Sequence, residues 1–414
     1  MSTAAPSHRR IAFAASVGNG LEWFDFAAYG LLATTLAQVF FPEELPSAGL
    51  LSTLAIFGVA FLVRPLAALG LGRLADRHGR RPVLLATMAV MSVSTLSIGL
   101  LPGTAQAGLL APLLLLLARI GQGVAVGAEW GVSASFISEW APPSRAGLFA
   151  STLGMTVALG TLLASLLIAL ITAWATPEAM LSWGWRIPFL VRGAIGLVGL
   201  VARARLPETP AYQQARQAPP PAERRLLLRR AALLAGITAY WTVLFYIVLS
   251  YVPTFVQAHG ALDTRQALAA NTAGLVVLVL LIPLAGALSD RFGRKRLSVA
   301  SAAWTMLVTV PLVQLLVQAS ALQLVLALAV WALALGINGA IAPLLAAQLF
   351  PVQARSAWVA TTYAVTVAVL GGSSPYLSEW LVQASGSPTA FAWLLVGFAG
   401  VGLWASLQLP DDTR

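Results

Sequence analysis

Apolar runs of about 20 residues recur along the whole chain, and each is long enough to cross the hydrocarbon core of a bilayer as a helix. The chain has 414 residues, of which 58% are hydrophobic and 10% are charged. Soluble domains are nearer to half apolar and a quarter charged. The sequence therefore predicts an all-α membrane protein that crosses the lipid bilayer many times.

Hydropathy and helix-breaking residues divide the chain into twelve predicted transmembrane helices. The predicted spans are about 11–40, 49–72, 82–101, 108–138, 146–173, 186–203, 231–257, 267–288, 297–317, 321–349, 356–383 and 388–409. One long polar connection, rich in Pro, Arg and Gln, cannot bury an apolar face and is typical of a linker. We therefore expect an N-terminal six-helix bundle over 1–203, a linker over 204–230 and a C-terminal six-helix bundle over 231–414.

The positive charges predict the orientation of the chain. Most of the 25 Lys and Arg residues fall in the termini and in loops on one side of the predicted helices, whereas Arg265 falls on the other side. Loops that stay in the cytoplasm attract Lys and Arg during insertion. We expect both termini in the cytoplasm of a bacterial inner membrane, and the net charge of +10 reports topology rather than nucleic-acid binding.

The two predicted bundles share loop sequences at equivalent places. GRLADRHGRR, residues 72–81, follows the second predicted helix, and GALSDRFGRK, residues 286–295, follows the eighth. EWAPPSRAG after the fourth helix has a counterpart in LFPVQARSA after the tenth. Parallel six-helix repeats of this kind place a substrate site between the halves, near the middle of the bilayer.

These motifs resemble the loop signature of the major facilitator superfamily. Three further segments, GNGLEWFDFAAYG, ARIGQGVAVGAEWGVSASFISEWAP and WGWRIPF followed by LPETPAYQQ, are similar to the metabolite:proton symporter family, whose members carry α-ketoglutarate, citrate, shikimate, proline and betaine. The resemblance covers nearly the whole chain and is greatest with the α-ketoglutarate branch. It implies the twelve-helix major facilitator fold, with two pseudo-symmetric bundles, and proton-coupled transport.

Three acidic residues fall well inside the predicted membrane region: Glu22, Asp25 and Glu129. Intramembrane acids are costly and usually mark a transport pathway or an ion pair. Glu22 and Asp25 lie one helical turn apart, and neighbouring carboxylates in a low dielectric resist being ionised together. We predict that the three acids couple transport to protons. The alternative is that they pair with buried arginines and only orient helices.

The fourth predicted helix carries Arg119 and Gln122 on the same face as Glu129. A guanidinium group matches a carboxylate with two parallel hydrogen bonds, so Arg119 and Gln122 are predicted to bind substrate. Arg119 is alternatively a fixed counter-ion of Asp25 or Glu129. Arg64 is expected to be mainly structural.

Further polar residues inside the predicted helices are candidates for binding the substrate. Arg192 is a departure from the family pattern, and it contacts either a substrate anion or a protein acid. The other predicted substrate-binding residues are Asn19, Tyr29, Tyr246, Asn338 and Tyr363.

The repeated loops are predicted to form a conformational latch between the halves. Asp76 and its counterpart Asp290 can accept hydrogen bonds at a helix N-terminus, where negative charge is favourable. The resemblance implies that this latch breaks and reforms during transport. The remaining predicted latch residues are Arg77, Arg80, Arg81, Arg145, Arg291, Arg294 and Arg355.

Together these features predict a symporter that imports a small organic anion, a di- or tricarboxylate such as α-ketoglutarate or citrate, by alternating access. The alternatives are a proton symporter of a zwitterion such as proline or betaine, and a receptor that keeps the fold without transport. The chain has no Cys, and its three His lie in predicted loops or the N-terminal tail. An enzyme is therefore not expected, no cofactor or metal is predicted, and the protein is expected to be monomeric.

Overall fold

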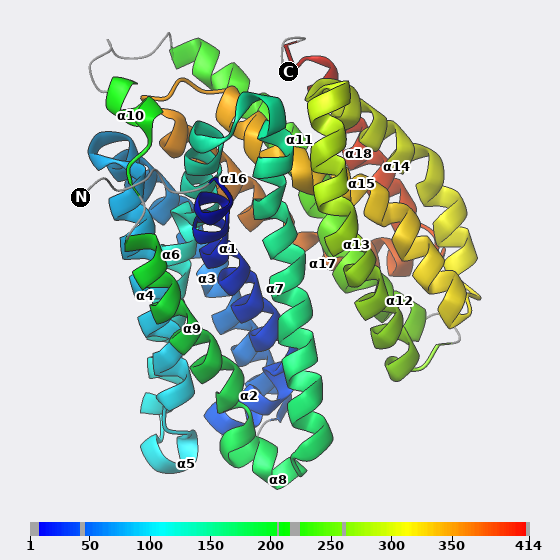
Figure 1. Cartoon of the computed structure of the whole chain (residues 1–414). Coiled ribbons are helices and arrows are strands. Elements are labelled where there is room, and N and C mark those ends of the chain that lie inside the picture. Colours follow the sequence, from blue (N-terminus) through cyan, green and yellow to red (C-terminus); the bar gives the residue numbers. More distant parts are fainter. Residues whose placement is uncertain (1–7, 42–45, 205–206, 216–223, 259–261, 411–414) are drawn as a thin grey trace.

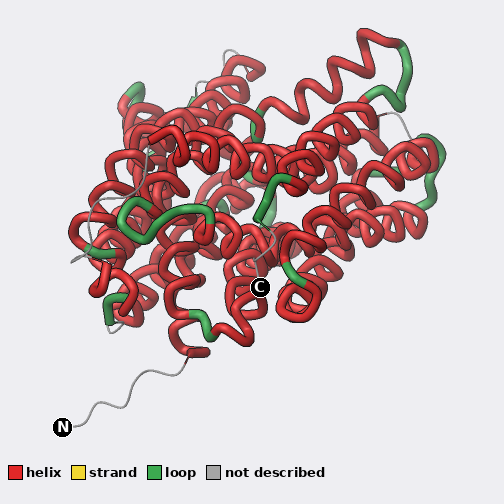
Figure 2. Tube along the Cα trace, turned by 90° about the horizontal axis from the view of Figure 1, so that it is seen from above, coloured by secondary structure: helices red, strands yellow, loops and turns green. Residues whose placement is uncertain are grey.

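A computed structural model describes residues 8–41, 46–204, 207–215, 224–258 and 262–410. It is 89% helix, and the described residues form no strand. Short loops join long helices (Figure 2). Parts of the predicted linker, including Arg205 and Arg216, and the C-terminal Arg414 lie outside the described residues.

The described part of the first half is built from long helices joined by short helical segments. Its elements are α1 (His8–Leu31), α2 (Ala33–Phe40), α3 (Pro46–His78), α4 (Arg80–Leu100), α5 (Thr104–Ala107), α6 (Leu110–Trp140), the 3-10 helix η1 (Pro143–Arg145), α7 (Ala146–Trp174), α8 (Pro177–Ala179), the π-helix η2 (Met180–Gly184) and α9 (Arg186–Ala204).

The second half repeats this arrangement after the short helix α10 (Pro210–Ala215). Its elements are α11 (Arg224–Tyr246), the π-helix η3 (Ile247–Tyr251), α12 (Val252–Ala258), α13 (Thr264–Phe292), α14 (Arg294–Leu316), α15 (Ala321–Gln348), α16 (Arg355–Leu370), α17 (Ser373–Ser385) and α18 (Phe391–Leu407). In Figure 1 the halves lie side by side, leaning together at the end that carries α10 and diverging toward the opposite end.

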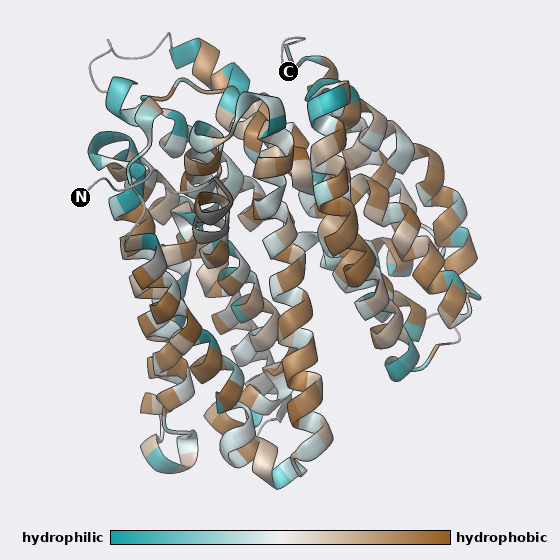
Figure 3. Cartoon of the chain, viewed as in Figure 1, coloured by the Kyte–Doolittle hydropathy of each residue, from teal (hydrophilic) through white to brown (hydrophobic). Residues whose placement is uncertain are grey.

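The apolar character of the helices suits a bilayer. Within the described residues, nine stretches are long and apolar enough to cross a membrane by length and composition alone, and α18 is a shorter apolar helix. Hydrophilic residues gather at the end of the molecule near α10, whereas hydrophobic residues dominate the middle of the helices (Figure 3). The prediction of an all-α membrane protein with the twelve-helix fold is confirmed.

The repeated loops form matching turns in the two halves. Gly79 separates α3 from α4 with φ 106°, and Gly293 separates α13 from α14 with φ 89°. A side chain at either position would strain this backbone, because positive φ favours glycine. The repeated glycine therefore lets one helix turn directly into the next at the same place in each half.

The two halves are joined at this end by a reciprocal pair of carboxylates. Asp76, near the end of α3, accepts hydrogen bonds from the backbone N–H groups of Ser356 (3.0 Å) and Ala357 (2.9 Å) in the first turn of α16. Asp290, near the end of α13, accepts from Gly147 (2.6 Å) and Leu148 (3.0 Å) in the first turn of α7. We call this end of the molecule the latch end. All four hydrogen bonds join one half to the other.

Candidate transport site

Each of the acids Glu22, Asp25 and Glu129 forms an ion pair with an arginine from another helix of the first half. Asp25 of α1 pairs with Arg192 of α9 (2.7 Å, Oδ2 to Nε). Glu22 of α1 pairs with Arg64 of α3 at 3.6 Å, and Glu129 of α6 pairs with Arg203 of α9 at 2.6 Å. All six side chains are buried. Buried charges are tolerated when they are paired and hydrogen-bonded, which explains how α1 and α6 keep acids within an apolar bundle.

Asp25 belongs to a chain of hydrogen bonds that ends at Arg119. The hydroxyl of Thr95 donates to Asp25 (3.0 Å), the amide of Gln122 donates to Thr95 (2.8 Å), and Arg119 donates to Gln122 (2.6 Å). The Arg119 guanidinium also lies over the ring of Tyr29, 4.4 Å from its centroid. These contacts are all with residues of the first half. Arg119 is thus linked to Asp25 indirectly, while Arg192 makes the direct ion pair.

Glu22 and Arg64 lie where the two halves meet. The Arg64 guanidinium is 4.3 Å from the ring centroid of Phe26 and 4.2 Å from that of Phe61. Tyr246 of α11 and Tyr363 of α16 lie close enough to interact electrostatically with both charged groups. The predicted substrate residues Tyr246 and Tyr363 therefore approach the first half at this ion pair.

Aromatic rings fill the contact around that pair. Trp23 of α1 meets Phe245 edge-on, with centroids 5.1 Å apart, and lies 6.4 Å from Tyr246. Trp130 of α6 stacks on Tyr363 at 4.0 Å, with the ring planes 11° apart. Stacked and edge-to-face pairs are favourable beyond the area they bury. The centre of the contact between the halves is thus largely aromatic, with one acid and one arginine beside it.

Arg203, at the predicted end of the N-terminal bundle, was not among the predicted site residues but belongs to the site. It donates to the carbonyl oxygens of Leu84 (3.1 Å) and Ala15 (2.7 Å) as well as to Glu129. The hydroxyl of Thr87 donates to the other oxygen of Glu129 at 2.7 Å. A long arginine side chain at a helix end can reach far from its own backbone, in this case into the bundle. The sequence did hold one clue, because an acid inside the membrane such as Glu129 needs a positively charged partner.

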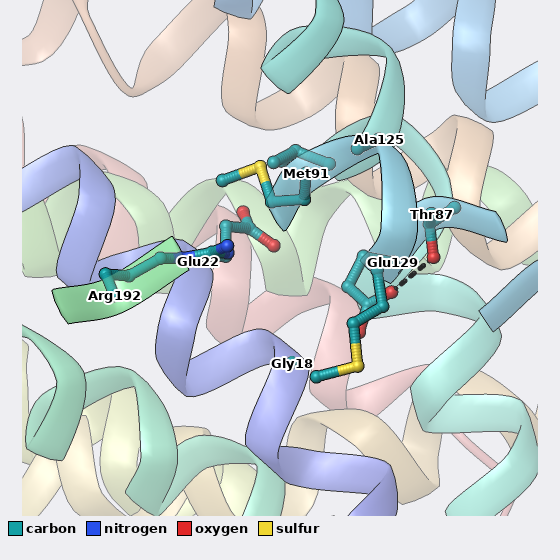
Figure 4. A pocket seen from close by; sticks show the side chains of 9 residues that line it. Gly18, Glu22, Thr87, Met91, Ala125, Glu129 and Arg192 are labelled. Atoms are coloured by element: carbon teal, nitrogen blue, oxygen red, sulfur yellow. Dashed lines mark hydrogen bonds between the residues drawn. The ribbon is translucent and has the colours of Figure 1, made fainter. Parts of the chain in front are cut away.

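A small cavity lies between these ion pairs, inside the first half (Figure 4). Its lining comes from α1, α4, α6 and α9 and includes Gly18, Glu22, Thr87, Ala125, Glu129 and Arg192. The space open to the centre of a water-sized molecule is about 10 Å³, room for roughly one water. This cavity is too small for an organic acid.

Three other predicted substrate residues hold helices together. Asn19 donates to the carbonyl oxygen of Leu153 (3.0 Å) on α7. The Tyr29 hydroxyl donates to the carbonyl oxygen of Thr53 (3.1 Å) on α3. Asn338 donates to Ala334 O (2.9 Å) and to the Ser301 hydroxyl inside the second half. Their described hydrogen-bond partners are thus protein groups, and Asn338 is bonded to α14 and to its own helix.

Glu139 is the centre of the latch-end network, which sequence analysis did not single out. Its carboxylate accepts from Arg80 (3.2 Å), from Arg355 of the second half (3.0 Å) and from the Thr209 hydroxyl (2.5 Å) of the segment before α10. Arg80 also donates to Val352 O of the second half at 2.5 Å. One buried carboxylate thereby ties together both halves and the start of the linker.

The other predicted latch residues divide into buried and exposed groups. Arg81 donates to Ala204 O at 2.6 Å. Buried Arg294 donates to Gln348 at 3.3 Å, so Gln348 is to Arg294 what Glu139 is to Arg80 in the first half. Arg77, Arg145 and Arg291 are exposed. The two copies of the latch are therefore not equivalent, because Gln348 supplies no charge.

Comparison with known proteins identifies the family to which this geometry belongs. The family described as "Sugar (and other) transporter" matches residues 11–230. The α-ketoglutarate permease of Escherichia coli is 35% identical over 413 residues, which cover 98% of this chain and 95% of the permease. The proline/betaine transporter of Salmonella typhimurium is 32% identical, covering 98% of this chain and 84% of that one. The chain belongs to the major facilitator superfamily.

The fold agrees with this assignment. The solved proton:xylose symporter XylE, bound to 6-bromo-6-deoxy-D-glucose, superposes with a TM-score of 0.82 at 18% identity, covering 98% of this chain and 96% of that structure. The resemblance to the metabolite:proton symporters is confirmed by the permease and proline/betaine relatives. The protein is a multi-pass membrane transporter with the fold and relatives of bacterial inner-membrane carriers.

Proposed function

We propose that the protein imports a small organic anion, a di- or tricarboxylate, together with protons. The observation that carries this proposal is the charge of the site. Among the described residues, the buried acids and arginines at membrane depth in the first half are Glu22, Asp25 and Glu129, and Arg64, Arg119, Arg192 and Arg203. The set has a surplus of one positive charge when all groups are ionised.

Protonation of one acid increases that surplus and so favours an anion in the same low-dielectric region. Binding of the anion in turn favours protonation, because the coupling between two ligands is reciprocal. A transporter with this linkage carries the anion and the proton together.

Glu22 and Arg64 are the pair best placed to make the exchange. Their 3.6 Å separation is wider than the Asp25–Arg192 pair, and they lie beside Tyr246 and Tyr363 of the second half. When Glu22 takes up a proton, Arg64 loses its protein anion and can bind a substrate carboxylate. When the substrate leaves, Glu22 releases its proton and pairs with Arg64 again.

The latch supplies the alternation of access. We place the latch end in the cytoplasm because the Lys and Arg residues of the repeated loops gather there. In that orientation the closed latch bars the cytoplasmic side, and import requires the Asp76 and Asp290 contacts to open after substrate and proton have bound.

A zwitterion is the second candidate, favoured by the aromatic contact. Trp23, Trp130 and Tyr363 form ring contacts between the halves, and aromatic faces attract quaternary ammonium groups. Betaine or proline would offer a carboxylate to Arg64 and a cation to Glu22 and the rings. The named relatives include transporters of both kinds.

Uptake by the purified protein in proteoliposomes tests the proposal. Radiolabelled α-ketoglutarate, proline and glycine betaine are offered in turn, with and without an inward proton gradient. We expect gradient-driven accumulation of α-ketoglutarate that collapses on addition of an uncoupler. Accumulation of betaine but not of α-ketoglutarate would select the second candidate, and equal internal and external levels of every compound under all gradients would refute transport.

A further inference from the structure

The cavity inside the first half contains two buried polar atoms with unused hydrogen-bonding capacity. Glu22 Oε2 and Arg192 Nη1 are buried, and among the described residues neither has a hydrogen-bond partner. Both side chains line the cavity, and in Figure 4 they approach one another from α1 and α9. Buried polar groups in proteins are satisfied by protein or by water. A cavity that is polar at two or more points and large enough for one molecule is where water binds.

Glu129 of α6 lines the same cavity. It lies beside Gly18, one helical turn before Glu22 on α1, because a Cβ atom on Gly18 would overlap Glu129 Oε1 and the Arg203 guanidinium. Glu22 and Glu129 therefore border one cavity that has room for roughly one water.

We propose that a proton passes between Glu22 and Glu129 through water in this cavity, along a route inside the first half that is separate from the substrate path. The proposal rests on the proposed function. The described lining residues come from α1, α4, α6 and α9, so beyond Glu22 the route leads away from the contact between the halves, where the substrate is proposed to bind.

The transfer conserves charge. Protonated Glu22 gives its proton to the water as the water gives one of its protons to the Glu129 carboxylate. Glu22 becomes an anion facing Arg64 and Arg192, and Glu129 becomes neutral beside Arg203 and Thr87. Glu129 then releases the proton to water that reaches it when the latch end opens, and its ion pair with Arg203 reforms.

The charged and titratable groups around the route come from every neighbouring element. Glu22 faces Arg64, Arg192, Asp25 and Glu129 within the first half, and Tyr246 and Tyr363 from the second. Glu129 faces Arg203 and the Thr87 hydroxyl. Met88 and Met91 form apolar walls, which confine water to the line between the two acids.

A change that fills the cavity and removes no ionisable group tests the route. Ala125 is a buried lining residue of α6, and Ala125→Val adds two methyl groups where the water is proposed. Ala128→Val is the matched control, because Ala128 is also buried in α6 but is outside the lining residues. Glu129→Gln is the second test, because the amide nearly conserves shape but cannot hold the proton.

The measurements are proton-driven accumulation and substrate exchange at equal concentration on both sides, made with whichever of α-ketoglutarate, proline and glycine betaine the unaltered protein accumulates. We expect Ala125→Val to lose accumulation and internal acidification while exchange continues, since exchange needs no proton release. Glu129→Gln should also lose accumulation, and Ala128→Val should accumulate normally.

The outcomes separate the route from the function. If the unaltered protein accumulates none of the compounds with protons, the proposed function fails and the route fails with it. If it does, but Ala125→Val and Glu129→Gln both accumulate like the unaltered protein, the route is wrong and the function stands. Equal loss in Ala128→Val and Ala125→Val would show a packing effect and overturn the route as well.

Discussion

Replacing Asp76 by Asn should open the latch. The carboxylate accepts from the N–H groups of Ser356 and Ala357, and an amide can accept only one of these bonds because its nitrogen is a donor. A hydrogen bond to a charged group contributes about 1.5–3 kcal/mol and a neutral one about 1 kcal/mol. The charge at the N-terminus of α16 contributes about 0.3–1 kcal/mol more. The closed state should therefore lose about 3 kcal/mol.

A loss of this size shifts the equilibrium between closed and open latch by roughly 100-fold. The chain has no Cys, so one introduced thiol reports on the latch without background. Ala347→Cys is suitable because Ala347 is 1% exposed and lines a latch-end cavity of about 220 Å³ between the halves. Access of a maleimide reagent to this thiol requires the latch to open.

We expect the labelling rate of the Ala347→Cys protein to rise roughly 100-fold when Asp76→Asn is added, and Asp290→Asn to act in the same way. Asp263→Asn is the control, because Asp263 caps α13 within its own half. An unchanged labelling rate in both latch variants, with the folded protein verified by thermal unfolding, would refute the reasoning that these carboxylates hold the halves together.

Further predictions follow from the ion pairs and the linker. Arg203→Met should destabilise the protein by about 3–5 kcal/mol, because Glu129 would be left without its guanidinium partner, and thermal unfolding should show recovery in the Arg203→Met, Glu129→Gln double variant. Arg64→Lys should raise the KM for α-ketoglutarate about tenfold or more, because lysine cannot form the two parallel hydrogen bonds that a guanidinium makes with a carboxylate. If uptake kinetics show a larger rise in KM for Arg119→Lys, Arg119 rather than Arg64 binds the substrate. Thr209→Val should remove the hydrogen bond to Glu139 and raise labelling of the Ala347→Cys protein by roughly tenfold, and an unchanged rate would show that the linker does not support the latch.

The fold was predictable from sequence because hydropathy and repetition are strong local signals. The turn at Gly79 and the turn at Gly293 follow from motifs whose spacing is visible in the chain. The acceptor role of Asp76 was equally accessible, since an acid at a helix end can only be satisfied by donors near it. The sequence did not identify the partner helix, and only the structure shows that Asp76 caps α16.

The pairing of acids with arginines was less accessible. Sequence spacing shows which residues share a helical face, but it does not show how the helices are rotated against their neighbours. Arg192 could be assigned to a substrate or an acid with equal reason until α9 was placed beside α1. Arg203 was missed because a residue at the end of a hydrophobic run is normally a loop charge, and only the three-dimensional packing shows its side chain turning inward.

The linkage between protons and anion is tested most directly by measuring the protons taken up when substrate binds. Isothermal titration of the detergent-purified protein with α-ketoglutarate, repeated in buffers of different ionisation enthalpy, gives this number without a membrane or a gradient. The account predicts net proton uptake on binding that is abolished in Glu22→Gln. Binding of α-ketoglutarate with no proton uptake at any pH between 6 and 8, roughly the range in which transport is expected to operate, would contradict it.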